Sequence, residues 1–253
     1  MFPDLFGVDG LTMNLLVVVG VIAACSVVFV YLKKFTLSKN TIIDLLITFI
    51  ATIVTGFIFA VLFENLYECI KNASLNNPQK WTWSMTFYGG IFGGVAAFFL
   101  MYKFYFLGNN EPILSKLLII APGAIALGHA FGRLGCFFNG CCYGKETESW
   151  YGILFPGFAH KVIPTQLFEM IFLFILAAIL LLLAFKWNSK FTLPIYLISY
   201  GIFRFFIEFV RGDERGQLGI LSPSQYWSIL LFVSGIVFLV VYIKGLQNKA
   251  QTE

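Results

Sequence analysis

Four polar side chains recur along one apolar stretch near the C-terminal end of the chain. In SYGIFRFFIEFVRGD, residues 199–213, Tyr200, Arg204, Glu208 and Arg211 follow one another at intervals of four, four and three. On a helix this spacing places all four on one face, with apolar residues around the rest. An arginine fork binds phosphate through two parallel hydrogen bonds and keeps its charge at physiological pH. The stripe therefore predicts an anion site, with a purely structural Arg204–Glu208 ion pair as the alternative.

A second arginine lies in the glycine-rich string GHAFGRLGCFFNGCCYGKE, residues 128–146. Here His129, Arg133 and Cys136 share a helical face at i, i+4 and i+7. Small residues let membrane helices approach closely, and they also leave space for a ligand headgroup beside Arg133. We expect Arg133 and Arg204, from different helices, to clamp one phosphate. The alternative is that Arg133 only extends its charge to the membrane interface.

A carboxylate in the apolar string VIPTQLFEMIF, residues 162–172, needs a partner. Pro164 suits the start of a helix, and Gln166 and Glu169 then lie three apart on one face. Glu169 falls about one turn inside the apolar run, where a buried charge requires an opposite charge. Holding an arginine in place is at least as strong an interpretation for Glu169 as catalysis.

The cysteines give no recognisable metal motif. Cys136, Cys141 and Cys142 have the spacing CxxxxCC rather than paired CxxC, and only His129 and His160 could add imidazole ligands. The sequence therefore predicts neither a metal nor a diffusible cofactor. A disulfide from Cys69 to one of the three, a buried structural thiol, and an activated nucleophile at Cys136 beside Arg133 all stay open.

The composition shows what kind of element must position these groups. Of 253 residues, 59% are hydrophobic and only 12% are charged, with a mean hydropathy of +0.84. Soluble domains carry about 25% charged residues, so this is a membrane protein and not a nucleic-acid-binding domain. Runs of roughly 20 apolar residues are long enough to span a bilayer as helices. They lie at about 11–32, 41–64, 84–107, 115–138, 164–186, 192–211 and 223–243.

These runs predict an all-α, polytopic fold of about seven transmembrane helices in a single domain over residues 1–253. Lysines cluster in the connections on one side, which is typical of the cytoplasmic face. They are Lys33, Lys34, Lys39, Lys103, Lys116, Lys186, Lys190, Lys244 and Lys249. We therefore expect the N-terminus outside, the C-terminus in the cytoplasm, and a multi-pass protein of the plasma membrane. The longest polar segments, about 65–83 and 140–163, then place the active site towards the outer leaflet.

Several strings together resemble one family. GRLGCFFNGCCYG resembles the prolipoprotein diacylglyceryl transferase signature GRxGNFxNxExxG. Four further blocks resemble the family's other segments and occur in family order over most of residues 84–240. These blocks are FYGGIFGGVAAF at 87–98, IPTQLFEM at 163–170, YGIFRFFIEFVRGD at 200–213 and LSPSQYWSI at 221–229.

The resemblance implies transfer of a diacylglyceryl group from phosphatidylglycerol to the lipobox cysteine thiol of a prolipoprotein, with release of glycerol phosphate. The implied partners are phosphatidylglycerol, the prolipoprotein signal peptide and membrane lipids. Arg133 and Arg204 match the family's two arginines. Further matches to the family pattern are Tyr200, Glu208, Arg211, Asn139 and Gly144. The implied catalytic set is Arg133, Arg204, Tyr200, Glu208 and, as an alternative base, His129. The implied substrate-binding set is Arg133, Asn139, Gly144, Arg211, Gln166, Glu169 and Tyr88.

The sequence departs from the family pattern at three positions. Tyr88 replaces the histidine proposed as a base, Cys136 replaces the first signature asparagine, and Cys141 replaces the signature glutamate. Tyrosine, with a pKa of about 10, is a poor base at neutral pH. The departures leave two alternatives: a divergent paralogue that uses another acceptor, or a phospholipid-binding membrane protein without chemistry. Against transport, the chain has no repeated halves.

Overall fold

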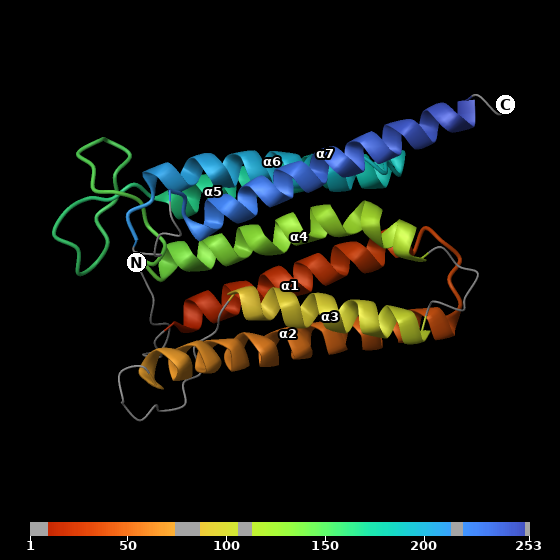
Figure 1. Ribbon diagram of the computed structural model, residues 1–253, viewed down its shortest axis with the longest axis horizontal. Helices are drawn as coiled ribbons and strands as arrows, with labels where there is room; N and C mark the ends of the chain where they lie inside the picture. Colours follow the sequence, from red (N-terminus) through yellow and green to blue (C-terminus); the bar gives the residue numbers. More distant parts are fainter. Residues whose placement is uncertain (1–9, 74–86, 106–112, 214–219, 251–253) are drawn as a thin grey trace. The chain divides into compact units, whose positions relative to one another are not determined.

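Helices account for nearly all of the regular structure. The structure is a computed structural model that describes residues 10–73, 87–105, 113–213 and 220–250. Within these ranges only isolated β-bridges occur beside the helices. The helices are α1 (Leu11–Leu32), α2 (Lys39–Ala73), α3 (Phe87–Tyr105), α4 (Ile113–Phe138), α5 (Thr165–Trp187), α6 (Thr192–Ile207), the 3-10 turn η1 (Glu208–Val210) and α7 (Pro223–Ala250) (Figure 1).

The helices confirm the predicted all-α membrane fold. Among the described residues, six helices are long and apolar enough to cross a bilayer, and α3 contributes a shorter apolar helix over Phe92–Tyr105. Continuous apolar runs form helices in a membrane because a helix satisfies every backbone polar group internally. The expected orientation of the termini stays a prediction.

The chain divides into two compact units, residues 1–34 with 114–253 and residues 35–113. The single domain expected from the sequence therefore also stays a prediction. In the unit of residues 35–113, α2 and α3 lie side by side (Figure 1). Glycine allows this contact, since a Cβ on Gly89 would come within 2.6 Å of the Phe59 carbonyl oxygen.

In the other unit, α4, α5 and α6 share a buried core. Its members include Ala130, Leu173, Ala177 and Tyr200. Glycines again set the close contacts: a Cβ on Gly20 of α1 would lie 2.8 Å from the Cβ of Phe131. On α6, a Cβ at Gly201 would lie 2.9 Å from the Ser228 carbonyl oxygen of α7. Helices that approach this closely can position side chains from several elements around one point.

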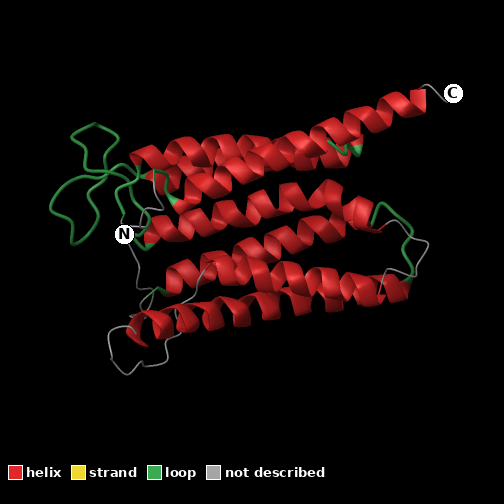
Figure 2. Cartoon of the chain, viewed as in Figure 1, coloured by secondary structure: helices red, strands yellow, loops and turns green. Residues whose placement is uncertain are grey.

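One end of this unit carries the long connection from α4 to α5. Residues 139–164 form loops and turns there, close to the end of α6 and the start of α7 (Figure 2). Backbone hydrogen bonds tie this connection down, from Gly144 N to Ile163 O at 2.8 Å and from Lys145 N to Val210 O at 2.8 Å. The functional candidates gather at this end.

The prediction of one continuous helical stripe through Arg211 is wrong. The α-helix ends at Ile207, η1 covers the next turn, and Arg211 has an extended backbone with φ −73° and ψ 146°. Arg211 pairs with Gly144 in an isolated antiparallel bridge. The apolar periodicity of the sequence continues past Ile207. There, however, the backbone pairs with residues of the α4–α5 connection and does not continue the helix.

Candidate active site

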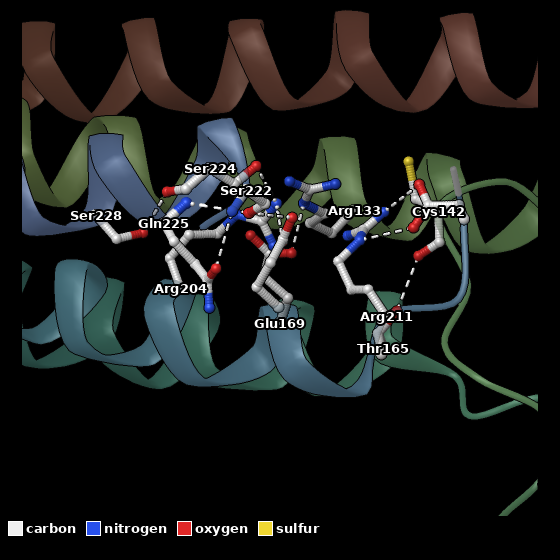
Figure 3. A network of polar contacts seen from close by, with 12 residues as sticks. Arg133, Cys142, Thr165, Glu169, Arg204, Arg211, Ser222, Ser224, Gln225 and Ser228 are labelled. Carbon is white, nitrogen blue, oxygen red and sulfur yellow. Dashed lines mark hydrogen bonds and ion pairs between the residues drawn. The ribbon is translucent and has the colours of Figure 1, made fainter. Parts of the chain in front are cut away.

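Glu169 of α5 is the centre of a buried polar cluster. Its side chain is 0% exposed, and its Oε2 lies 3.0 Å from Nε of Arg133 on α4. Tyr200 of α6 donates a hydrogen bond of 2.9 Å to Oε1, and Nε2 of His129 lies 3.8 Å from the same oxygen. Figure 3 shows Glu169 and Arg133 pointing toward one another. The predicted need of Glu169 for an arginine partner is confirmed, and the pair offsets the cost of burying each charge.

A second cluster surrounds Arg204 at the junction of α6, η1 and α7. Nη2 of Arg204 lies 2.9 Å from Oε2 of Glu208 and donates to Oγ of Ser224 at 3.0 Å. Ser222 donates to Oε1 of Glu208 at 2.9 Å (Figure 3). The predicted i,i+4 pair of Arg204 and Glu208 is therefore confirmed. Nη1 of Arg204 is buried without a hydrogen-bond partner among the described residues, so a donor remains for a ligand.

Arg211 forms a bidentate ion pair with Asp213. Its Nε and Nη2 donate to the two carboxylate oxygens at 2.9 and 2.8 Å. Burial lowers the pKa of Arg211, but the hydrogen bonds and charge of Asp213 raise it more, so the net pKa lies above its ordinary value. Arg211 therefore keeps its positive charge throughout the physiological range.

All three arginines thus have an acidic partner that fixes the guanidinium plane. Such preorganised donors stabilise charge that develops during a reaction, because they do not need to reorient. A Cβ added to Gly132, the residue before Arg133, would meet no atom within 4 Å. The expectation that glycine leaves room for a headgroup beside Arg133 stays a prediction.

Other predicted site residues have supporting positions. Gln166 is buried and donates to the Cys141 carbonyl oxygen at 2.6 Å. Gly144 lies where the α4–α5 connection packs against the end of α6, and a Cβ there would lie 2.7 Å from the Val210 carbonyl oxygen. Asn139 is exposed in the turn after α4. Tyr88 lies in the first turn of α3, and its side chain is outside the described part of the structure.

The sequence interpretation missed two features of the site. Ser222 and Ser224 complete the contacts of Glu208 and Arg204, and their signal was the string LSPSQ, to which no role was given. The sulfur atoms of Cys136, Cys141 and Cys142 all lie within 4.8 Å of one another. Adjacent cysteines just after the Asn-Gly that ends a helix were the available signal for this second feature.

The turn that carries these cysteines is fixed by its backbone. Cys142 has φ 66°, in the left-handed region that residues other than glycine rarely adopt. Its carbonyl oxygen accepts a hydrogen bond of 2.8 Å from Oγ1 of Thr165 (Figure 3). No disulfide joins any of the five cysteines of the chain. The left-handed conformation of Cys142 persists only where the surrounding structure holds it.

A family model described as prolipoprotein diacylglyceryl transferase matches residues 11–241. The chain belongs to the prolipoprotein diacylglyceryl transferase family. The match runs from the start of α1 into α7 and includes every candidate residue named above.

Three relatives illustrate the extent of the similarity. The chain is 33% identical over 243 residues to the phosphatidylglycerol–prolipoprotein diacylglyceryl transferase of Clostridium tetani, covering 92% of this chain and 93% of that one. It is 34% identical over 245 residues to that of Finegoldia magna, covering 95% and 94%. It is 40% identical over 171 residues to phosphatidylglycerol–prolipoprotein diacylglyceryl transferase 2 of Clostridium perfringens, covering 65% of this chain and 64% of that one.

Membership in the prolipoprotein diacylglyceryl transferase family agrees with the resemblance found in the sequence blocks. The structure brings together four of these residues from three helices. They are His129 and Arg133 of α4, Glu169 of α5 and Tyr200 of α6. It places Arg204 and Glu208 with the serines of a further block. The geometry therefore assembles most of the residues that the resemblance singled out.

Proposed function

We propose that this protein transfers the diacylglyceryl group of phosphatidylglycerol to the lipobox cysteine thiol of a prolipoprotein and releases glycerol phosphate. One observation carries the proposal: Arg133 and Arg204 are both held by buried carboxylates, and Arg204 keeps an unpartnered N–H. Family membership and the names of the relatives agree with a transferase of this kind.

The proposed reaction is a displacement at the glycerol carbon that carries the phosphate ester. The thiolate sulfur forms a bond to this carbon while the carbon–oxygen bond breaks, and the electron pair leaves with the phosphate oxygen. Negative charge therefore grows on the departing phosphate. Arg133 and Arg204 stabilise that charge, and their fixed positions avoid the cost of reorientation during the reaction.

An apolar groove on α5, α6 and η1 offers a surface for acyl chains. It has a volume of about 560 Å³ and is lined by Phe172, Ser199, Ile202, Phe203, Phe206, Ile207 and Val210. On α6, Phe203 and Phe206 are one and two positions from Arg204, so the groove lies on another face of this helix than the Arg204 side chain.

The acceptor approaches from the outer leaflet in this proposal. The loops of residues 139–164 lie at the end of this unit where α4 and α6 end and α5 and α7 begin (Figure 1). Arg133 is near the end of α4, Arg204 is in the last turn of α6, and Arg211 directly follows η1. The charge pattern of the connections supports an outer position for this end. A signal peptide that spans the membrane would present its lipobox cysteine at that level.

The test is mass spectrometry of a lipobox peptide incubated with the purified protein and phosphatidylglycerol. Wild type should add the diacylglyceryl mass to the peptide cysteine. Arg133→Lys and Arg204→Lys should each lose about 100-fold or more of the rate, because a point charge does not replace a guanidinium fork. Lys161→Arg, in the exposed part of the loop, is the matched control. Full activity in both arginine variants would refute the phosphate clamp.

A second candidate has a specific observation in its favour. Cysteines replace the signature asparagine and glutamate at Cys136 and Cys141, beside the proposed clamp. A paralogue that moves the lipid-derived group to another acceptor would explain altered residues on the acceptor side. Expression in a strain depleted of its own transferase separates the two candidates, since only a true prolipoprotein transferase restores lipoprotein modification.

A further inference from the structure

Three thiols converge at the end of α4 without any motif that predicts it. Cys136 lies in the last turn of the helix, and Cys141 and Cys142 follow in the turn after it. Their sulfur atoms lie within 4.8 Å of one another. Around a tetrahedral zinc ion with zinc–sulfur bonds of about 2.3 Å, the sulfurs are about 3.8 Å apart. Closing the three thiols on one ion therefore requires shifts of about 1 Å or less, within the reach of side-chain rotation.

Hydrogen bonds to the main chain hold the turn of the three cysteines in place. The Cys141 amide donates to the Cys136 carbonyl oxygen at 3.2 Å, which closes the turn on the helix end. Gln166 and Thr165, at the start of α5, donate to the carbonyl oxygens of Cys141 and Cys142 at 2.6 and 2.8 Å. These hydrogen bonds fix the main chain of the turn and so limit where the three sulfur atoms can lie. Cys142 is held in the left-handed region, with φ 66°.

Two positive charges act on the cysteine cluster. Arg133 interacts with Cys136 and Cys142, and Arg211 interacts with Cys142. These charges would offset the net negative charge of three thiolates around one divalent ion. Three sulfur ligands without a carboxylate select soft or borderline-soft cations such as zinc over magnesium or calcium. Catalytic zinc sites have three protein ligands and keep the fourth position open for water or substrate. Among the residues that the structure describes, the cysteine cluster supplies three ligands.

We propose that Cys136, Cys141 and Cys142 bind one zinc-class divalent cation, and that its fourth position takes the acceptor thiol. The spacing of these cysteines along the chain predicted no metal site. The inference of a metal site comes from the folded turn, which brings the three sulfur atoms together. The part that concerns the acceptor rests on the proposed function, whereas the metal site does not.

The chemistry of the step balances. On coordination the acceptor thiol gives its proton to water, because a metal-bound thiol is held as thiolate. The sulfur electron pair then forms the bond to the glycerol carbon, and the carbon–oxygen pair leaves with glycerol phosphate. The thioether product carries no charge, so it is a weaker ligand and dissociates. This supplies a thiolate in a chain where Tyr88 replaces the family's histidine base.

Metal binding is tested on the reduced, detergent-solubilised protein with Co²⁺ as a spectroscopic probe and Zn²⁺ as competitor. We expect one Co²⁺ per chain, with the visible bands of a tetrahedral ion and sulfur charge-transfer absorption, both lost on addition of Zn²⁺. Cys136→Ser, Cys141→Ser and Cys142→Ser should each weaken binding at least tenfold, while Cys25→Ser and Cys69→Ser should not. Absence of the bands in wild type, or their survival in all three cluster variants, would overturn the site.

A second measurement needs no variant and so does not depend on folding. Bound Zn²⁺ should protect Cys136, Cys141 and Cys142 of wild type from alkylation by N-ethylmaleimide, as mapped by mass spectrometry. Cys25 and Cys69 should react equally with and without Zn²⁺. Equal labelling of the cluster in both conditions would overturn the site, as would a disulfide between two of its cysteines in protein blocked directly in membranes.

Activity then separates this inference from the proposed function. Chelation should abolish diacylglyceryl transfer to the peptide, and Zn²⁺ should restore it. Transfer that is unaffected by chelation would refute the role of the metal and leave the proposed function standing. Confirmed metal binding with no transfer under any condition would refute the proposed function and leave the metal site standing.

Discussion

Glu169 shows how much a single buried carboxylate organises. Its two oxygens contact Arg133, Tyr200 and His129, which belong to two neighbouring helices. Removing one partner of a buried ion pair leaves the other charge uncompensated, which costs more than the pair itself contributes. The cluster therefore positions Arg133 and also holds α4, α5 and α6 together.

Glu169→Gln tests this at the residue scale. The substitution keeps the shape of the side chain but leaves the Arg133 charge buried without its partner. We expect a loss of about 3–5 kcal/mol in the free energy of unfolding, measured by thermal or denaturant unfolding in detergent. Glu148→Gln, at an exposed loop position, should leave stability unchanged. Equal stability of the two variants would show that the pair does not hold these helices together.

Tyr200→Phe separates the hydrogen bond from the ion pair. The change removes the O–H that donates to Glu169 and keeps the aromatic ring, which stacks on Tyr196 at 5.9 Å. A hydrogen bond to a charged group contributes about 1.5–3 kcal/mol, so we expect a loss of that size in unfolding free energy. Phe203→Leu, which removes a ring from the neighbouring stack with Phe172, is the control for aromatic packing. Wild-type stability of Tyr200→Phe would contradict this account.

At the scale of elements, the joint between the α4–α5 connection and the end of α6 depends on glycine. Gly144 faces Arg211 in a bridge, and a Cβ there would lie 2.7 Å from both the Ile163 Cβ and the Val210 carbonyl oxygen. These contacts are backbone and β-carbon atoms, which do not move aside like the end of a long side chain. The joint fixes where Arg211 lies relative to the cysteine turn.

Gly144→Ala should therefore destabilise the protein by about 1–3 kcal/mol and make the connection more sensitive to protease. Limited proteolysis followed by mass spectrometry would locate new cuts within residues 139–164. Gly245→Ala is the matched control, because a Cβ there meets no atom within 4 Å. A cleavage pattern like that of wild type would show that the joint tolerates the extra atom.

The elements themselves were largely predictable from sequence, and the site was predictable in part. Long apolar runs leave helices as the regular solution in a bilayer, so the helix positions followed from hydropathy. The Arg204–Glu208 pair followed from the spacing, and the need of Glu169 for an arginine followed because a buried charge needs a partner, but the sequence did not identify that arginine as Arg133. Arg211 could not be placed, since periodicity does not show where backbone contacts from a distant loop end a helix. The sequence grouped Cys136, Cys141 and Cys142 at the end of one helix, but the approach of their sulfur atoms could not be predicted because the left-handed backbone of Cys142 leaves no mark in the spacing.

At the scale of the whole molecule, orientation is the main prediction still to be tested. Lys33 and Lys34 follow α1, Lys186 ends α5, and Lys190 precedes α6, which concentrates positive charge at one end of these helices. We expect that end, and the C-terminus after α7, in the cytoplasm. A fluorescent protein fused to the C-terminus should fluoresce, and an alkaline phosphatase fusion there should be inactive. The reverse pattern would contradict the orientation and the outer position of the site.

The pairing of charges also has a consequence for how the chain is made. The α6–η1 segment carries its own counter-ion, because Arg204 and Glu208 are one turn apart. α4 and α5 differ, since Arg133 and Glu169 neutralise each other only when both helices are present. A lone charge costs roughly 2.5–3.5 kcal/mol at the centre of a helix during insertion and less near a helix end, where Arg133 and Glu169 lie. Biogenesis should therefore favour release of α4 and α5 from the translocon together, as a hairpin, so that the pair enters lipid already neutral.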